Sequence, residues 1–218
     1  MGHKINPKAF RLGTIYTWTS RWFSEDKKYK FFVVEDDIIR KTITNKIKPA
    51  GIDRIEIERS INKINIILYV VRPGMVIGRG GQGLEELKKY LLKTILIFRK
   101  KQNNLDKKSN FKLDLRVEPV KEPYLSANFV ATQIAEQLER RLPHKRVIGF
   151  AMDKVISAHA KGVKVMVSGR IAGAEIARRE SYKIGSIPLS TIREKVDFAS
   201  VPALTKSGYI GVKIWICK

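Results

Sequence analysis

The stretch VIGRGGQGLEE, residues 76–86, holds glycines whose spacing could do chemistry. Gly78, Gly80 and Gly83 fit the pattern G-x-G-x-x-G, which in a dinucleotide-binding turn lets a pyrophosphate approach the backbone. The same run contains a shorter element, GRGG at residues 78–81, of the form G-x-x-G. Between two helices, such a loop lets a sugar–phosphate backbone come close and offers amide groups to its phosphates. The two patterns predict different ligands, a nucleotide cofactor or a nucleic acid.

The surrounding sequence favours the nucleic acid. A dinucleotide fold needs its glycines directly after a buried strand, and an acidic residue about twenty positions later at the end of a second strand. Here Pro73 and Gly74 break the strand before the glycines, and Asp106 lies in the polar run KKQNNLDKK. We therefore expect no nucleotide cofactor. The predicted RNA contacts of this loop are Gly78, Arg79, Gly80 and Gly81.

The charge of the chain points to a polyanionic partner. Lys and Arg number 43 against 21 Asp and Glu, which gives a net charge of +22 over 218 residues. An enzyme for small metabolites rarely needs this excess, because self-repulsion works against the compact state. The sequence has no P-loop, no G-x-S-x-G and no H-E-x-x-H. The single cysteine, Cys217, and three scattered histidines predict neither a disulfide nor a metal site. We expect a binding protein without cofactor or metal, and not an enzyme.

The elements that must position the glycine loop form an α+β domain, which we place at residues 21–118. A helix is predicted from Ser24 to Lys48, because isoleucines recur near a helical period and Pro49 ends it. Two alternating strands follow, and then a short helix, the loop and a long helix. The charged loop 99–110 and a third strand at 111–120 complete the domain.

A second α+β domain, with a sheet packed on helices, is predicted over residues 119–218. Two amphipathic helices cover 126–142 and 144–160, and alternating strands include 163–170, 190–200 and 208–217. We expect a short helix over 172–183, with a basic face that contacts phosphate. The alternative is a solvated face with intrahelical pairs such as Glu175 with Arg179. The predicted phosphate contacts are Arg170, Arg178, Arg179 and Lys183.

Residues 1–20 lack an apolar period, so we expect an extended basic arm that can be deleted without unfolding either domain. The arm is either solvated or laid along a phosphate backbone. Aromatic residues beside its cations favour the second, with Lys4, Lys8 and Arg11 as contacts. It has no continuous apolar core, so it is not a secretory signal. The longest apolar run, INIILYVV, is too short to span a membrane, and no membrane partner is expected.

Four ordered motifs resemble the S-three family of small-subunit ribosomal proteins. RPGMVIGRGGQGLEELKK is similar to the type II KH domain of that family, and MGHKINPKAFRLG to its N-terminal signature. SGRIAGAEIARRE and GYIGVKIWI resemble parts of its C-terminal domain. The resemblance implies a component of the small-subunit head. It would be bound to ribosomal RNA beside the messenger entry channel, with neighbouring ribosomal proteins as further partners.

The resemblance also implies that messenger RNA is contacted by the basic run ERRLPHKRVIG. The residues that match are Arg140, Arg141, Lys145 and Arg146. The run departs from the family pattern in two places, because Pro143 interrupts the helix and Gly149 stands where the family has a further basic residue. These departures put messenger unwinding in doubt.

Two functions therefore remain. One is a structural RNA-binding component of a ribosome, in the cytoplasm or in an organelle. The other is a stand-alone KH-type regulator of RNA, or an enzyme that acts on nucleic acid. Charge spread over both domains favours the first, because a free regulator usually concentrates its charge on one face.

Overall fold

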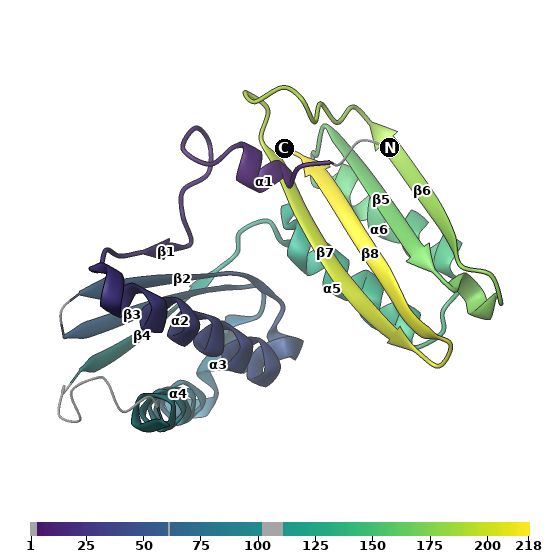
Figure 1. Cartoon of the computed structure of the whole chain (residues 1–218). Helices are drawn as coiled ribbons and strands as arrows, with labels where there is room; N and C mark the ends of the chain where they lie inside the picture. The colour runs from purple at the N-terminus through teal and green to yellow at the C-terminus, as the bar shows by residue number, and fades with distance from the viewer. Residues whose placement is uncertain (1–3, 61, 102–110) are drawn as a thin grey trace. The chain divides into compact units, whose positions relative to one another are not determined.

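The computed structural model describes residues 4–60, 62–101 and 111–218. The chain divides into two compact units (Figure 1). The first unit is Trp18–Val120, and the second unit joins Lys121–Lys218 to the N-terminal segment that ends at Thr17. The predicted α+β class with two domains is confirmed. Most of the predicted charged loop 99–110, with Asp106, lies outside the described residues, as does His3.

A four-stranded sheet with the strand order β1-β2-β3-β4 forms one layer of the first unit. β2 (Ile52–Ser60) and β3 (Lys63–Val70) are the two strands predicted from alternating residues, and they pair antiparallel. β3 runs parallel to β4 (Lys112–Pro119), and β1 (Ser20–Arg21) pairs in parallel with β2. Parallel neighbours need a crossover connection. The chain between β3 and β4 supplies it, and this connection carries the glycine loop.

Two long helices, α2 (Asp26–Ile47) and α4 (Gln82–Lys101), cover one face of this sheet, and the short helix α3 (Pro73–Ile77) precedes α4 (Figure 1). Isoleucines spaced four apart in α2 fall on one helical face and are buried, as are Leu87, Leu91 and Ile95 of α4. α2 ends at the single turn η1 (Lys48–Ala50), where Gly51 has a φ of 70°. The buried face of α4 therefore holds this helix against the sheet, and the glycine loop lies at its N-terminal end.

Part of the positive charge of the first unit is buried in ion pairs. Arg59 of β2 donates to Glu35, at 2.7 Å, and to Asp36, both on α2. Arg99 of α4 donates to the other oxygen of Glu35 at 2.9 Å. These bonds tie β2, α2 and α4 together. Neither guanidinium group is free for a nucleic acid, because both are bound to carboxylates.

The second unit is a four-stranded antiparallel sheet with helices on one face (Figure 1). The strand order is β6-β5-β8-β7. Alternate residues such as Val165 of β5 and Ile214 of β8 pack against the helices. The bounds are α5 (Ala127–Glu139), α6 (His144–Ser157), β5 (Gly162–Gly169), β6 (Arg178–Gly185), β7 (Val196–Thr205) and β8 (Gly208–Cys217), with single turns η3 (Pro123–Leu125) and η4 (Ile171–Gly173).

The short helix predicted over 172–183 is wrong, because the second half of this stretch, from Arg178 on, belongs to strand β6. Its residues alternate between two faces: Tyr182 packs on the helix-side core, and the neighbouring Lys183 is exposed. Pairing with the buried strand β5 outweighs the local helical preference of AEIARR. The predicted intrahelical pair of Glu175 with Arg179 has no helix to hold it.

The extended arm predicted over residues 1–20 is also wrong for the part described. Residues 7–10 form the short helix α1 (Pro7–Phe10), capped by the side chain of Asn6. The Tyr16 hydroxyl donates to the carbonyl of Val196 in β7 at 3.0 Å. The N-terminal segment, residues 4–17, is therefore part of the second unit, and its deletion would remove some of that unit's packing.

Candidate nucleic-acid interface

The glycine loop exposes its arginine on a backbone that needs glycine. η2 (Arg79–Gly81) links α3 to α4, with φ values of 70° at Gly78, 60° at Gly80 and 80° at Gly81. Residues with a β-carbon rarely adopt such values, which explains the glycines without reference to any ligand. Arg79 is the one residue of the four with a side chain, and it is exposed. The loop therefore presents one cation on a bare backbone.

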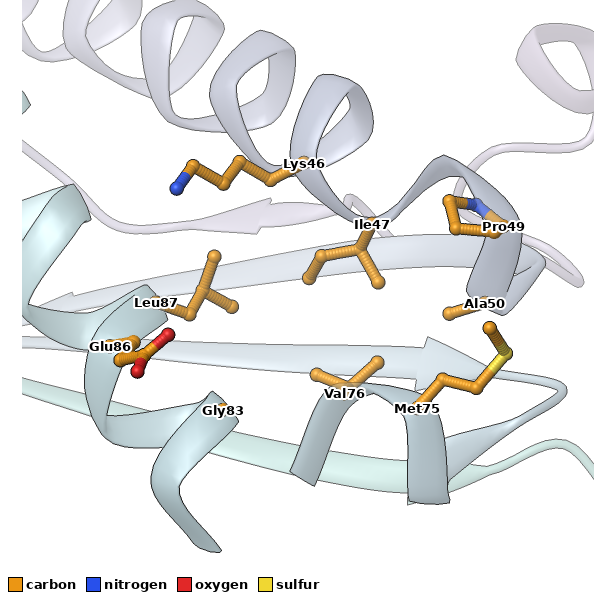
Figure 2. Close-up of a pocket in the computed structure, with 9 residues that line it drawn as sticks. All are labelled: Lys46, Ile47, Pro49, Ala50, Met75, Val76, Gly83, Glu86 and Leu87. Atoms are coloured by element: carbon orange, nitrogen blue, oxygen red, sulfur yellow. The ribbon is translucent and has the colours of Figure 1, made fainter. Parts of the chain in front are cut away.

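Gly83 is explained by the packing of α3 on α4. A β-carbon at Gly83 would lie 2.8 Å from the carbonyl oxygen of Val76, so only glycine allows this approach. Figure 2 shows the small pocket beside the contact, into which Ile47, Val76 and Leu87 point from three elements. Its volume is about 160 Å³. Pockets for drug-sized ligands occupy about 300–1,000 Å³. This pocket does not suit a dinucleotide.

The start of α4 places positive charge next to the glycine loop. The first amide groups of an α-helix have no partner within the helix, and the helix dipole places positive charge there. The glycine loop opens at that end of α4, beside the exposed Arg79. The glycines follow a helix rather than a strand, unlike those of a dinucleotide-binding turn. This geometry is compatible with a phosphate backbone at the loop, and that contact stays a prediction.

The prediction that Arg11 contacts RNA is wrong, because its side chain is buried. The Arg11 residue is 0% exposed. Its Nε donates to the carbonyl of Glu194 at 2.7 Å, and its Nη2 to that of Thr191 at 2.8 Å. Further bonds reach the carbonyls of Pro7, Pro188 and Leu189. The guanidinium group holds the loop before β7 and cannot reach RNA.

The other two predicted cations of the segment differ from each other. Lys8 Nζ lies 2.7 Å from an oxygen of Asp197, a residue that is only 4% exposed. Burial opposes ionisation of Asp197, but Lys8, Lys218 and the amide of Ala127 outweigh it and keep the pKa of Asp197 below its ordinary value. Lys8 is therefore a structural partner. Lys4 is exposed.

The four cations predicted in the second unit lie in different places. Arg179 and Lys183 are on the side of the sheet away from α5 and α6, which we name the open face. Arg178 is on the other side, 2.8 Å from Glu180, and Arg170 donates to the carbonyl of Ala174 at 2.8 Å. The open face therefore contains two of the four predicted cations, and the single basic face predicted for a helix is wrong.

Two further cations lie on the open face and were not predicted from the sequence. Lys164 of β5 and Lys213 of β8 alternate with buried residues, and the runs VKVMV and GVKIWI contain that signal. Lys164 Nζ lies 5.5 Å from the centre of the Trp215 ring. Burial, and then the nearby charges of Lys4 and Lys183, lower the pKa of Lys164. Cations that repel one another in this way favour an anion between them.

The predicted messenger-contacting residues surround the turn between α5 and α6. Arg140 and Arg141 follow the last turn of α5, and Lys145 and Arg146 lie in the first turn of α6. All four are exposed. Pro143 separates the helices, as predicted, and is the residue before α6. The cluster and the start of α6 place positive charge at one end of the second unit.

Other kinds of site find no support in the described residues. They contain no group of three or more His, Cys, Asp or Glu that could hold a metal ion. Cys217 is buried, and burial followed by the charge of Glu194 raises the pKa of its thiol. No helix in the described ranges is long and apolar enough to cross a membrane.

Comparison with known proteins gives the family. The family model of the KH domain matches residues 38–125, and that of the C-terminal domain of ribosomal protein S3 matches residues 134–216. A protein of Caldicellulosiruptor bescii named "Small ribosomal subunit protein uS3" is 44% identical over 219 residues, covering 100% of this chain and 92% of the relative. This chain belongs to the uS3 family. The uS3 protein of Lactobacillus helveticus is also 44% identical, over 99% of this chain and 90% of its own.

The two family-model matches divide the predicted sites between them. The KH match contains the glycine loop, and the C-terminal match contains the open face and the cluster predicted to contact messenger RNA. The N-terminal segment lies outside both matches, and its place in the second unit rests on its own contacts.

Proposed function

We propose that this chain is a structural component of the small ribosomal subunit and binds ribosomal RNA through both units, rather than acting as an enzyme. The observation that carries the proposal is the glycine loop. It presents the exposed Arg79 on three glycines with positive φ at the start of α4. Relatives along the full chain are named as small ribosomal subunit proteins, which supports the same assignment.

The proposal places the chain in the head of the subunit, beside the messenger entry channel. The cluster Arg140, Arg141, Lys145 and Arg146 would face messenger RNA. Contacts of this kind fix position and do not read sequence. Neighbouring ribosomal proteins would be its other partners, on ribosomes in the cytoplasm or in an organelle.

A sedimentation experiment tests the assignment. A tagged chain is expressed in a bacterium, and the lysate is run on a gradient in low magnesium and high salt. We expect the tag in the small-subunit fraction. A tag that stays at the top of the gradient while native subunits form would support the alternative, a stand-alone regulator or an enzyme acting on nucleic acid.

Salt dependence tests RNA binding by the purified protein. Counterion release makes the logarithm of affinity for single-stranded RNA fall by about 0.7 per phosphate contact for each tenfold rise in salt. Because a charge of +22 is distributed over both units, we expect a slope that reflects several contacts. A flat titration would contradict electrostatic binding.

A further inference from the structure

The open face of the second unit contains a second pocket, separate from the glycine loop and from the messenger-contacting cluster. Its volume is about 680 Å³, within the range of about 300–1,000 Å³ typical of ligand pockets. β5, β6, β7 and β8 supply its floor and one side. The N-terminal segment supplies most of the rest with residues 4–7 and Phe10, and the loop before β7 adds Leu189 and Ser190.

The floor of this pocket is apolar and aromatic. Met166, Phe198 and Trp215 come from three neighbouring strands and form a small cluster distinct from the main core. The rings of Phe198 and Trp215 lie 5.2 Å apart, tilted by 42°. Trp215 is only 7% exposed, so it forms the bottom of the pocket. Met166 and Phe198 are half-buried and give the accessible surface.

The rim of the pocket is cationic. Lys4, Arg179 and Lys213 line it, and all three are exposed. Strand register places Lys164 beside Lys183 and Met166 beside Lys213. No Asp or Glu is among the strand residues of this face, because Glu180 and Asp197 alternate onto the helix side. Glu194, in the loop before β7, is paired with Lys161 at 2.8 Å.

We propose that this pocket takes one unpaired nucleotide of ribosomal RNA, with the base on Met166 and Phe198 and the flanking phosphates held by Lys4, Arg179 and Lys213. The proposal rests on the proposed function, because it assumes an RNA partner. Proteins recognise RNA chiefly at unstacked bases, which stack on aromatic side chains. An apolar floor inside a ring of cations matches a flat base attached to a charged backbone. A duplex would not enter the pocket, because its bases are already stacked.

The test compares an unstructured oligoribonucleotide with an abasic ribose-phosphate of the same length. Both probes carry the same charge, so their difference in affinity reports the base. Wild type should prefer the base-containing probe by about tenfold, the effect expected of one stacked base. Met166→Glu should remove that preference. Lys213→Glu should weaken binding of both probes and lower the salt slope by about 0.7.

Two control variants separate failure of the pocket from failure of the proposed function. Lys206→Glu makes the same charge change at an exposed turn of the second unit that does not line the pocket. Arg79→Glu alters the glycine loop instead. Both control variants should keep the preference for the base-containing probe. Circular dichroism confirms that each variant folds. If wild type binds RNA but Met166→Glu keeps the full preference, the pocket proposal is overturned and the proposed function stands. If wild type binds neither probe, both are overturned.

Crosslinking in assembled small subunits distinguishes the possible occupants. Under ultraviolet light, the strand peptides that contain Phe198 and Trp215 should crosslink to RNA. Crosslinks to a neighbouring protein would assign the pocket to a protein partner instead. Uridine monophosphate is a further probe for the purified protein. Tight binding of that mononucleotide without a base preference in RNA would assign the pocket to a free nucleotide and overturn the proposal.

Discussion

The N-terminal segment and the glycine loop look alike in sequence and differ completely in structure. Each places an arginine close to glycine, RLG at Arg11 and GRGG at Arg79. Arg11 is 0% exposed and donates to carbonyl groups, whereas Arg79 is exposed at the tip of a turn. The difference lies in the partners of the guanidinium group. A cation whose donors are already bound by backbone carbonyls is a structural residue, and net charge alone does not separate the two kinds.

Replacing Arg11 should have the largest effect on stability. Arg11→Ala removes the donors for several carbonyl groups, and hydrogen bonds to a charged group contribute about 1.5–3 kcal/mol each, though not additively. We expect a loss of about 3 kcal/mol or more in the free energy of unfolding, measured by urea denaturation. Arg79→Ala is the matched control and should leave stability within about 0.5 kcal/mol of wild type. Equal stabilities for the two variants would contradict the structural role of Arg11.

Gly83→Ala should have the next largest effect. The new methyl group would meet the carbonyl of Val76 at 2.8 Å and force α3 away from α4, which overpacking data put at about 1–3 kcal/mol. Gly74→Ala is the control, because it lies in α3 with nothing within 4 Å of the added carbon. Thermal unfolding of both variants checks the prediction. A stable Gly83→Ala protein would show that the close approach of the helices is not required.

Asp197 should make stability depend on pH. Its folded pKa lies below its ordinary value, so it contributes stability that is fully present above the unfolded pKa, about 3.9. That contribution is lost as pH falls through the folded pKa. Asp197→Asn should therefore be less stable than wild type at neutral pH and lose less stability on acidification. Urea unfolding of both proteins at neutral pH and at acidic pH measures this difference in stability. If the stabilities of the two proteins change equally with pH, the role of Asp197 is contradicted.

Arg79→Glu should have the smallest effect of the four, and on binding only. Loss of one phosphate contact, with some repulsion, should weaken binding of single-stranded RNA by about tenfold and reduce the salt slope by about 0.7. Arg116→Glu makes the same change at an exposed position of β4 in the same unit. It should bind like wild type. If both variants bind equally weakly, the loop is not a specific contact.

The spacing of apolar residues predicted most of the fold, because it marks the buried face of each helix and strand. The isoleucines of α2, the leucines of α4 and the alternating strands β2, β3 and β8 all report which face meets the core. β6 was missed because AEIARR has a local helical preference, and only pairing with β5 decides otherwise. That information lies in a different part of the chain.

The turn at the glycine loop was predictable because its backbone conformation requires glycine, and its RNA contact stays a prediction. The glycines at 78, 80 and 81 have positive φ, a constraint that is visible in the sequence. Arg11 was misassigned because its partners are carbonyls some 180 positions away, with nothing in their side chains to reveal them. The open-face pocket was missed for a similar reason, since its lining comes from the N-terminal segment and all four strands.

Arginine modification before and after assembly tests the central claim most directly. Purified protein and gradient-purified small subunits are treated with an arginine-specific dicarbonyl reagent, and the modified peptides are quantified by mass spectrometry. Arg79 and Arg179 should react in the free protein and be protected in the subunit, and Arg11 should be protected in both. Equal reactivity of Arg79 in the two samples would contradict an RNA contact at the loop, and a reactive Arg11 in the folded free protein would contradict its structural role.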